Sequence, residues 1–172
     1  MRPDRLEREP LVRALDGQEL SVLDCTFGMG YDALLLIAAG ARVTVLELDP
    51  LILAHSVDGL LRYAPELARH LAYRRADHRA LLPQLPARSY DIVYLDPMFS
   101  APGTGSNLSA IRGYTSPDRL DPALLKIALR VSRTHVILKL APREVPLDPP
   151  AGACLSIIRS HRQRFACWSP GI

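Results

Sequence analysis

Apolar and polar residues follow two alternating patterns along the chain, and these patterns predict strands and helices in turn. Short apolar runs predict strands, whereas longer segments with an apolar residue at every third or fourth position predict helices. The strands are expected at residues 20–25, 42–48, 71–75, 90–95, 134–140, 154–159 and 164–168. The helices are expected at residues 3–15, 33–39, 51–63 and 122–131, with a further short helix that begins at Pro65.

The order of these elements predicts an α/β fold. Strands that alternate with helices pair in parallel, with right-handed crossovers. The last two strands are separated only by a short turn, which predicts an antiparallel hairpin at one edge. A mostly parallel seven-stranded sheet with such a C-terminal hairpin is the layout of Rossmann-like class I methyltransferases, whereas a dinucleotide dehydrogenase would have another strand–helix–strand unit there. We expect a single domain over residues 1–172.

Composition narrows the class of protein without naming a function. Apolar residues make up 48% of the 172 residues and charged residues 23%, which is ordinary for a soluble globular protein. No apolar run reaches the length of a membrane span and no leader-like segment opens the chain, which predicts no membrane partner. Three scattered cysteines with no C-x-x-C pair predict a reduced, cytoplasmic protein, and five histidines without ligand spacing predict no metal site. The net charge of +3 permits a nucleic-acid partner without requiring one.

A loop with two glycines follows the first predicted strand. Its sequence from Gly28 to Ala33 fits G-x-G-x-x-A, a weak signal that NAD-binding proteins share. Dinucleotide sites usually place the first glycine at the strand end, where backbone N–H groups meet a pyrophosphate. Here Asp24 occupies the strand end, and a carboxylate suits a ligand that carries an ammonium and a sulfonium. The loop therefore favours S-adenosylmethionine (SAM) over NAD.

Acidic residues stand at the ends of four predicted strands. In an open α/β sheet the ligand lies beyond the carboxyl ends of the strands, so Asp24, Glu47, Asp77 and Asp96 are expected around one pocket. Glu47 would accept the ribose hydroxyls, the alternative being a solvated charge. Asp77 would accept the adenine amino group, the alternative being an aspartate that caps a helix.

The stretch Asp96-Pro97-Met98-Phe99 carries the most chemistry. It is close to the D/N-P-P-Y/F/W motif of methyltransferases that act on exocyclic amines of nucleobases. Such an amine is a poor nucleophile because its lone pair is spread into the ring. The carboxylate of Asp96 and the carbonyl of Pro97 would accept its two hydrogens and aim the lone pair at the methyl group. Phe99 would stack on an unstacked base. The alternative is a turn after a strand, with Phe99 in the core.

The chain resembles the RsmJ type of 16S ribosomal RNA guanine-N2 methyltransferases. The resemblance covers roughly residues 20–172 and is carried by VLDCTFGMGYDALLLIAAGARVTVLELDP, VDGL, IVYLDPMF, HVILK and HRQRFACWSPG. It implies SAM as cofactor, ribosomal RNA or the small ribosomal subunit as substrate, and methylation at guanine N2. The expected cofactor-binding residues are Asp24, Phe27, Gly28, Gly30, Tyr31, Asp32, Glu47, Leu48, Asp77, His78 and Asp96. The expected catalytic residues are Asp96, Pro97, Met98 and Phe99.

Two departures from that family keep other functions open. Members carry an added N-terminal segment, where only a short helix is expected here, and a lysine-rich stretch after D-P-M-F, where residues 100–107 carry no charge. Both would reduce phosphate contacts, so SAM binding is better supported than the RNA target. The alternatives are a methyltransferase for a small molecule or for an adenine or cytosine amine in DNA, and a non-catalytic SAM-binding module. A loop expected at residues 100–118 would discriminate among them, because an open loop favours a nucleic acid and a closed lid favours a small molecule.

One lysine stands inside a predicted strand. Lys139, in a buried strand, is expected to be a snorkelling or paired lysine.

Overall fold

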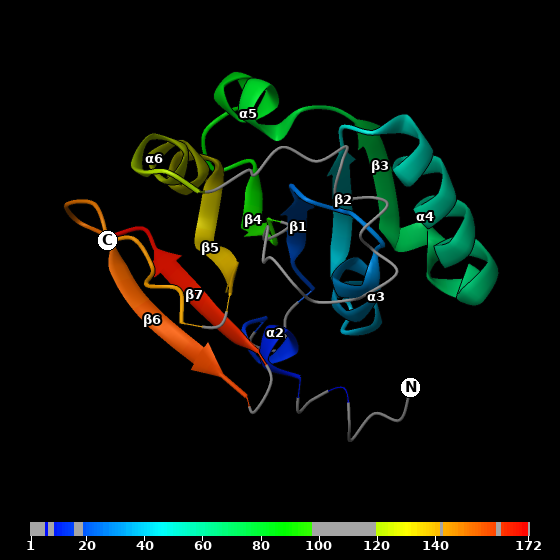
Figure 1. Cartoon of the computed structure of the whole chain (residues 1–172), viewed down its shortest axis with the longest axis horizontal. Coiled ribbons are helices and arrows are strands. Elements are labelled where there is room, and N and C mark those ends of the chain that lie inside the picture. The colour runs from blue at the N-terminus through cyan, green and yellow to red at the C-terminus, as the bar shows by residue number, and fades with distance from the viewer. Residues whose placement is uncertain are drawn as a thin grey trace.

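Seven strands form one mixed sheet at the centre of the protein. The computed structural model describes residues 6, 9–15, 19–97, 120–141, 143–160 and 163–171. The strands lie in the order β3-β2-β1-β4-β5-β7-β6, with β3 beside α4 at one edge and β6 at the other (Figure 1). They are β1 (Ser21–Asp24), β2 (Arg42–Glu47), β3 (Leu71–Arg75), β4 (Tyr90–Leu95), β5 (Ser132–Leu140), β6 (Cys154–Arg159) and β7 (Arg164–Ser169). The first five pair in parallel, whereas β7 is antiparallel to both β5 and β6.

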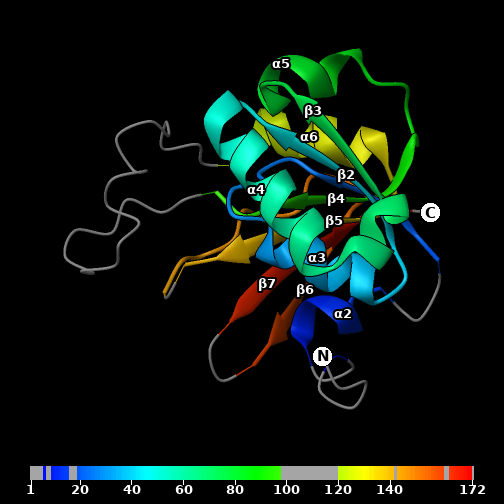
Figure 2. The same ribbon diagram turned by 90° about the vertical axis from the view of Figure 1, so that its right-hand side faces the viewer.

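Helices cover both faces of this sheet (Figure 2). One face packs against α2 (Pro10–Arg13), α3 (Tyr31–Ala38) and α4 (Pro50–Tyr63). The other face packs against α5 (His78–Leu81) and α6 (Pro122–Val131). Two 3₁₀ helices, η1 (Pro65–His70) and η2 (Leu82–Gln84), follow α4 and α5.

The central strands are apolar on both sides because both sides are covered. In β4, Ile92 and Tyr94 belong to the core under α3 and α4, whereas Val93 and Leu95 belong to the core under α6. All four side chains are at most 2% exposed. This double burial is why parallel strands read as continuous apolar runs rather than alternating ones.

The predicted fold class is confirmed, and the strand predictions agree with the structure to within two residues. Three differences concern helices. The segment from His78 to Gln84 forms α5 and η2, where no helix was predicted. The segment after Pro65 is a 3₁₀ helix. Within the helix expected at residues 3–15, the structure places α2 at Pro10–Arg13 and a helical residue at Leu6, whereas residues 3–5 and 7–8 lie outside the described residues. The loop expected at residues 100–118 lies outside the described residues.

The chain crosses the sheet in two directions from β1. After β1 it runs outward through β2 to β3, and it then returns to place β4 on the other side of β1. The adjacent loops therefore diverge at the carboxyl ends of β1 and β4, and such switch points are where open α/β sheets bind ligands. In the part of the chain that the structure describes, no helix is long and apolar enough to cross a membrane, and no cluster of three or more potential metal ligands is found.

Candidate active site

The glycine loop between β1 and α3 is held in a left-handed conformation. Gly28 and Gly30 have φ angles of 51° and 75°, which other residues adopt only at a cost. The ring of Phe27 lies against Gly30, since a Cβ added at Gly30 would be 2.9 Å from Cε2 of that ring. From α4, the hydroxyl of Ser56 donates a 2.7 Å hydrogen bond to the carbonyl of Gly28. The loop is thus fixed from two sides, with its backbone close to the end of β1.

Glu47, the last residue of β2, lies against this loop. Its Oε2 accepts the backbone N–H of Gly28 at 3.1 Å, and its Oε1 accepts that of Asp49 at 3.0 Å. The carboxylate is half-buried and is therefore held in one orientation beside the glycines. Leu48, the next residue, is 58% exposed at the same sheet edge. These are the positions at which the sequence predicts the ribose.

Asp24 ends β1 directly beneath the loop, where the structure buries it. The side chain is 1% exposed, and its Oδ1 accepts the backbone N–H of Thr26 at 3.0 Å. Burial raises the pKa of Asp24 to about 8, and the nearby carboxylates of Asp32, Asp96 and Glu47 add to this effect. Asp24 is therefore mainly protonated at neutral pH. That it attracts the charges of a cofactor stays a prediction.

A second group of polar side chains joins α3, β4 and β5. The ammonium of Lys139 lies 2.7 Å from Oδ2 of Asp32 and 2.8 Å from Oδ2 of Asp96. The hydroxyl of Tyr94 donates a 2.6 Å hydrogen bond to the same Oδ2 of Asp32. We refer to Asp32, Tyr94, Asp96 and Lys139 as the acid–lysine cluster. Lys139 is thus a paired lysine, one of the two roles expected for it.

The charges of this cluster depend on each other. Burial raises the pKa of Asp96 to about 6, although Lys139 opposes the shift, and Asp32 raises the pKa further. Burial alone would lower the pKa of Lys139, but the carboxylates of Asp96 and Asp32 raise it overall. The backbone of Asp96 is also held, because its N–H donates to Oγ1 of Thr26 at 2.6 Å. Asp96 is therefore an anchored carboxylate that is largely ionised at neutral pH.

The remaining predicted residues lie around the same edge of the sheet. Asp77 is the N-cap of α5, where its carboxylate accepts the backbone N–H of Arg79 at 2.8 Å, the alternative role considered for it. His78, the first residue of α5, is buried. Tyr31, the first residue of α3, is 74% exposed. Pro97 is buried. The predicted catalytic residues Met98 and Phe99 lie outside the described residues.

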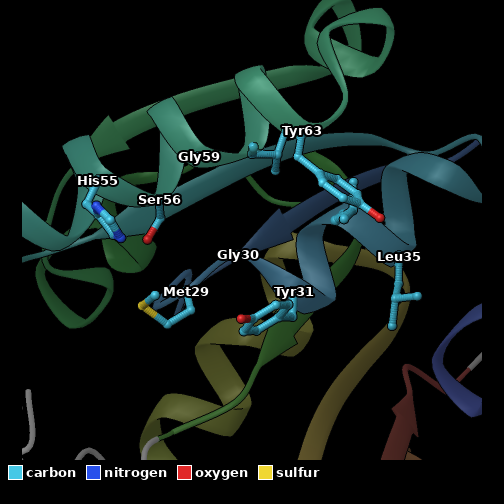
Figure 3. A pocket seen from close by; sticks show the side chains of 10 residues that line it. Met29, Gly30, Tyr31, Leu35, His55, Ser56, Gly59 and Tyr63 are labelled. Atoms are coloured by element: carbon cyan, nitrogen blue, oxygen red, sulfur yellow. The ribbon is translucent and has the colours of Figure 1, made fainter. Parts of the chain in front are cut away.

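A separate pocket of about 520 Å³ opens on the helix side of the glycine loop, between α3 and α4. Figure 3 shows Tyr31 of α3 and Tyr63 of α4 on opposite sides of the pocket. Met29 and His55 line the pocket farther from Tyr63, on the left of this view. The pocket shares Met29 and Gly30 with the loop, but no member of the acid–lysine cluster lines it. The acids predicted to surround the ligand therefore lie at the strand ends and not in this pocket.

Three residues of the site carried little signal in the sequence. Thr26 stands in the loop without a motif of its own. In the sequence, Tyr94 fits the apolar pattern of a buried strand, although a fully buried tyrosine generally needs a partner for its hydroxyl. Lys139 carries no motif beyond its place in a buried strand, which predicts only a snorkelling or paired lysine. The signal that could have found the last two is the same, namely a polar group inside a buried strand.

The strand order, with its antiparallel C-terminal pair, is that of the Rossmann-like class I methyltransferase fold. Among solved structures, the chain is similar to a SAM-dependent methyltransferase from Neisseria gonorrhoeae, with a TM-score of 0.69 and 22% identity over 94% of this chain and 71% of that one. The family model described as "Putative SAM-dependent methyltransferase" matches residues 2–168. The chain belongs to this family, and the cofactor in the family's description is the one that the sequence predicts.

Curated relatives match over most of this chain but extend beyond it. Ribosomal RNA small subunit methyltransferase J of Alkalilimnicola ehrlichii is 38% identical, over 86% of this chain and 61% of that protein. The protein of the same name from Thioalkalivibrio sulfidiphilus is 34% identical, over 83% of this chain and 61% of that protein. These matches confirm the resemblance seen in the sequence. The chain spans about three fifths of the length of these relatives.

Proposed function

We propose that the protein transfers a methyl group from SAM to an exocyclic amino group of an RNA base, and that this group is N2 of a guanine in small-subunit ribosomal RNA. The observation that carries the proposal is the anchored, partly exposed carboxylate of Asp96 at the carboxyl end of β4. It lies in the sheet edge next to the glycine loop, where a methyl donor and an acceptor can meet.

The residues of this edge fit SAM in shape and in charge. The left-handed Gly28 adds no side chain next to the end of β1, and Gly30 leaves room for the ring of Phe27. The carboxylate of Glu47 can accept ribose hydroxyls, since each carboxylate oxygen has more than one lone pair. The carboxylates of Asp32, Glu47 and Asp96 all lie close enough to Asp24 to raise its pKa, and the ammonium of Lys139 pairs with only two of them, Asp32 and Asp96. That excess of negative charge suits a ligand with an ammonium and a sulfonium.

Asp96 has the chemistry needed at the acceptor. When bound, SAM would supply a methyl group on a sulfonium: the amine nitrogen would take it as the carbon–sulfur bond breaks, the thioether product would leave, and the nitrogen would then give one proton to Asp96 or water. An ionised Asp96 accepts one hydrogen of that amine, and the carbonyl of Pro97 is proposed to accept the other. The nitrogen becomes more tetrahedral, so its lone pair points out of the plane of the base. Alignment of this kind can supply about 7–11 kcal/mol of a reaction barrier.

Two observations support an RNA base as the acceptor. The D-P-M-F stretch resembles motifs for exocyclic amines of nucleobases. The curated relatives are named ribosomal RNA small subunit methyltransferase J. The choice of guanine N2 rests on the sequence resemblance to the RsmJ type and is the most specific part of the proposal.

The test is to supply the protein with methyl-labelled SAM and, separately, small ribosomal subunits, naked ribosomal RNA and DNA. We expect label in ribosomal RNA, presented either alone or in the subunit, and recovery of the label as N2-methylguanosine after digestion to nucleosides. Label in another nucleoside of RNA would contradict the guanine assignment. Label in DNA alone would support the DNA alternative. SAM binding without transfer to any of the three would favour a small-molecule enzyme or a non-catalytic module.

A further inference from the structure

We propose that Lys139 is a positioning residue, whose ammonium joins Asp32 to Asp96 and so fixes the orientation and the charge of the Asp96 carboxylate. The ammonium donates a hydrogen bond to Oδ2 of Asp96. The other oxygen, Oδ1, is then the one that would accept a hydrogen of the acceptor amine. The role in methyl transfer rests on the proposed function, whereas the control of the Asp96 charge does not.

The backbone that carries Lys139 is held on both sides. In the register of β4 and β5, Leu95 pairs with Leu138, so Lys139 follows beside Asp96. On its other side Lys139 pairs with Phe165 of β7. A side chain supported by two strand pairings gives a more precise position than one on a loop. The ammonium can therefore act as a fixed point for the carboxylate.

The ion pair of Lys139 with Asp32 holds the ammonium in place even if the more exposed Asp96 side chain moves. Asp32 lies in the first turn of α3, and its side chain is 13% exposed, against 30% for Asp96. The hydroxyl of Tyr94 donates to Asp32 from within the core. Tyr94, Asp32, Lys139 and Asp96 thus form a chain of contacts that begins in the core and ends at the most exposed member, where a substrate would arrive.

The groups around Asp96 make the cation necessary. In the described part of the chain, the titratable groups that act on Asp96 and its neighbours in this cluster are Asp24 from β1, Asp32 from α3, Tyr94 from β4 and Lys139 from β5. Asp24 and Tyr94 are mainly protonated and carry no charge at neutral pH, so the charged neighbours of Asp96 are the carboxylate of Asp32 and the ammonium of Lys139. Without Lys139, Asp96 would be a partly buried carboxylate beside the carboxylate of Asp32 and would take up a proton at higher pH. A protonated Asp96 loses the charge with which it would accept an amine hydrogen.

The first experiment needs neither substrate nor cofactor. The protein is labelled with ¹³C at the aspartate carboxyl groups, and the Asp96 signal is identified by its loss in Asp96→Asn. Its titration midpoint is then measured in the wild type, Lys139→Met, Lys139→Arg and Lys126→Met. Lys126 is the chain's other lysine and is exposed on α6, so it is the matched control.

We expect Lys139→Met to raise the midpoint of Asp96 by about 1–3 pH units, the usual effect of a neighbouring charge. Lys139→Arg should restore much of the wild-type midpoint, and Lys126→Met should not change it. An unchanged midpoint in Lys139→Met overturns the proposal. If Lys139→Met does not fold, Lys139→Gln, which keeps a polar side chain but no charge, gives a second test and should raise the midpoint by a similar amount. A midpoint in Lys139→Gln equal to that of the wild type contradicts the proposal.

The second experiment follows the acid limb of kcat with saturating SAM. In Lys139→Met this limb should move to higher pH by the same amount as the Asp96 midpoint, with the KM for SAM changed no more than a few-fold. A purely structural lysine would lower kcat at every pH without moving the limb, and that result overturns the positioning role. If the wild type transfers no methyl group, the proposed function fails, but the titration of Asp96 still decides whether Lys139 controls its charge.

Discussion

The backbone N–H of Gly28 and the carboxylate of Glu47 meet at 3.1 Å, although one lies in the loop after β1 and the other at the end of β2. The hydrogen bond fixes the acid and the glycine loop relative to each other before any ligand arrives. A pre-aligned acceptor loses little freedom on binding, which favours affinity. The loop and the acid are therefore expected to act as one binding element.

Substitution of Glu47 should weaken SAM binding. Glu47→Ala is expected to cost about 1.5–3 kcal/mol, the scale of a hydrogen bond to a charged group. Calorimetry measures this, with Asp58→Ala as control, because Asp58 is an exposed acid of α4 paired with Arg62. Glu47→Gln, which keeps one acceptor oxygen, should lose less. Tight binding of NAD with no binding of SAM would overturn the assignment of the whole loop.

Substitution of Asp96 should affect turnover far more than cofactor binding. An interaction that strengthens only as the methyl is transferred contributes to kcat. Asp96→Ala is expected to lower kcat by about 10²–10³-fold, the range for loss of one preorganised polar group. SAM affinity should change by about 1 kcal/mol or less, which is within several-fold. The role of Asp96 is excluded if Asp96→Ala methylates at the wild-type rate with saturating SAM.

Methyl transfer by the wild type should decline in acid. Burial raises the pKa of Asp96 to about 6 in the folded protein. The ionised carboxylate is the form that accepts an amine hydrogen, so kcat should be constant above this pKa and fall about tenfold per pH unit below it. Rates measured between about pH 4.5 and 8.5, with stability checked at each pH, test this. A profile that is flat through pH 6 would show that the charge of Asp96 is not needed.

Asp24 should make the protein less stable as the pH rises from about 4 to about 8. Its folded-state pKa is about 8, whereas an unfolded aspartate titrates near 3.9. Between these values the folded state holds a proton that the unfolded state has lost, so the free energy of unfolding falls by up to about 1.4 kcal/mol per pH unit.

Asp24→Asn keeps an acceptor for the backbone N–H of Thr26 and removes this titration. The two proteins should be similar in stability near pH 4, and the variant should become progressively more stable by pH 8. Urea unfolding at several pH values measures the difference. A difference between wild type and variant that does not change with pH would show that Asp24 is not protonated in the folded state.

Gly30→Ala should destabilise the protein more than Gly40→Ala. Both glycines have positive φ angles, so both variants carry the strain of a left-handed alanine, roughly 1–2 kcal/mol. At Gly40 nothing lies within 4 Å of the added Cβ, whereas at Gly30 it would lie 2.9 Å from the buried ring of Phe27. Overpacking of this kind adds about 1–3 kcal/mol. Equal losses in urea unfolding would show that the ring moves aside freely.

The sheet could be predicted because each strand is a short apolar run bounded by polar or turn residues. The helix at α5 could not, since four residues show no periodicity and Pro83 interrupts the segment. What the sequence does show there is Asp77, considered as a cap as well as a ligand. Short helices depend on their caps and on packing rather than on a repeating pattern.

The acids at the strand ends could be placed at one edge because parallel strands end together. The acid–lysine cluster could not, because Asp32 and Lys139 lie 107 residues apart and meet only when α3 packs on the sheet, while the register of β4 and β5 brings Lys139 beside Asp96. Burial of Asp24 was equally hidden, since a polar residue after an apolar run reads as exposed. Contacts of this kind follow from tertiary packing and leave no local pattern.

The position of β7 has a consequence for how the protein is made. β6 precedes β7 in the chain, yet it is the edge strand and joins the sheet through β7. A nascent chain emerges N-terminus first, so β1 to β5 can assemble while β5 still presents an open edge. Such an edge can pair with other chains until β7 inserts. The single tryptophan, Trp168, lies in β7 between Val136 and Leu155 and is fully buried. Its fluorescence is therefore expected to change when β7 inserts between β5 and β6.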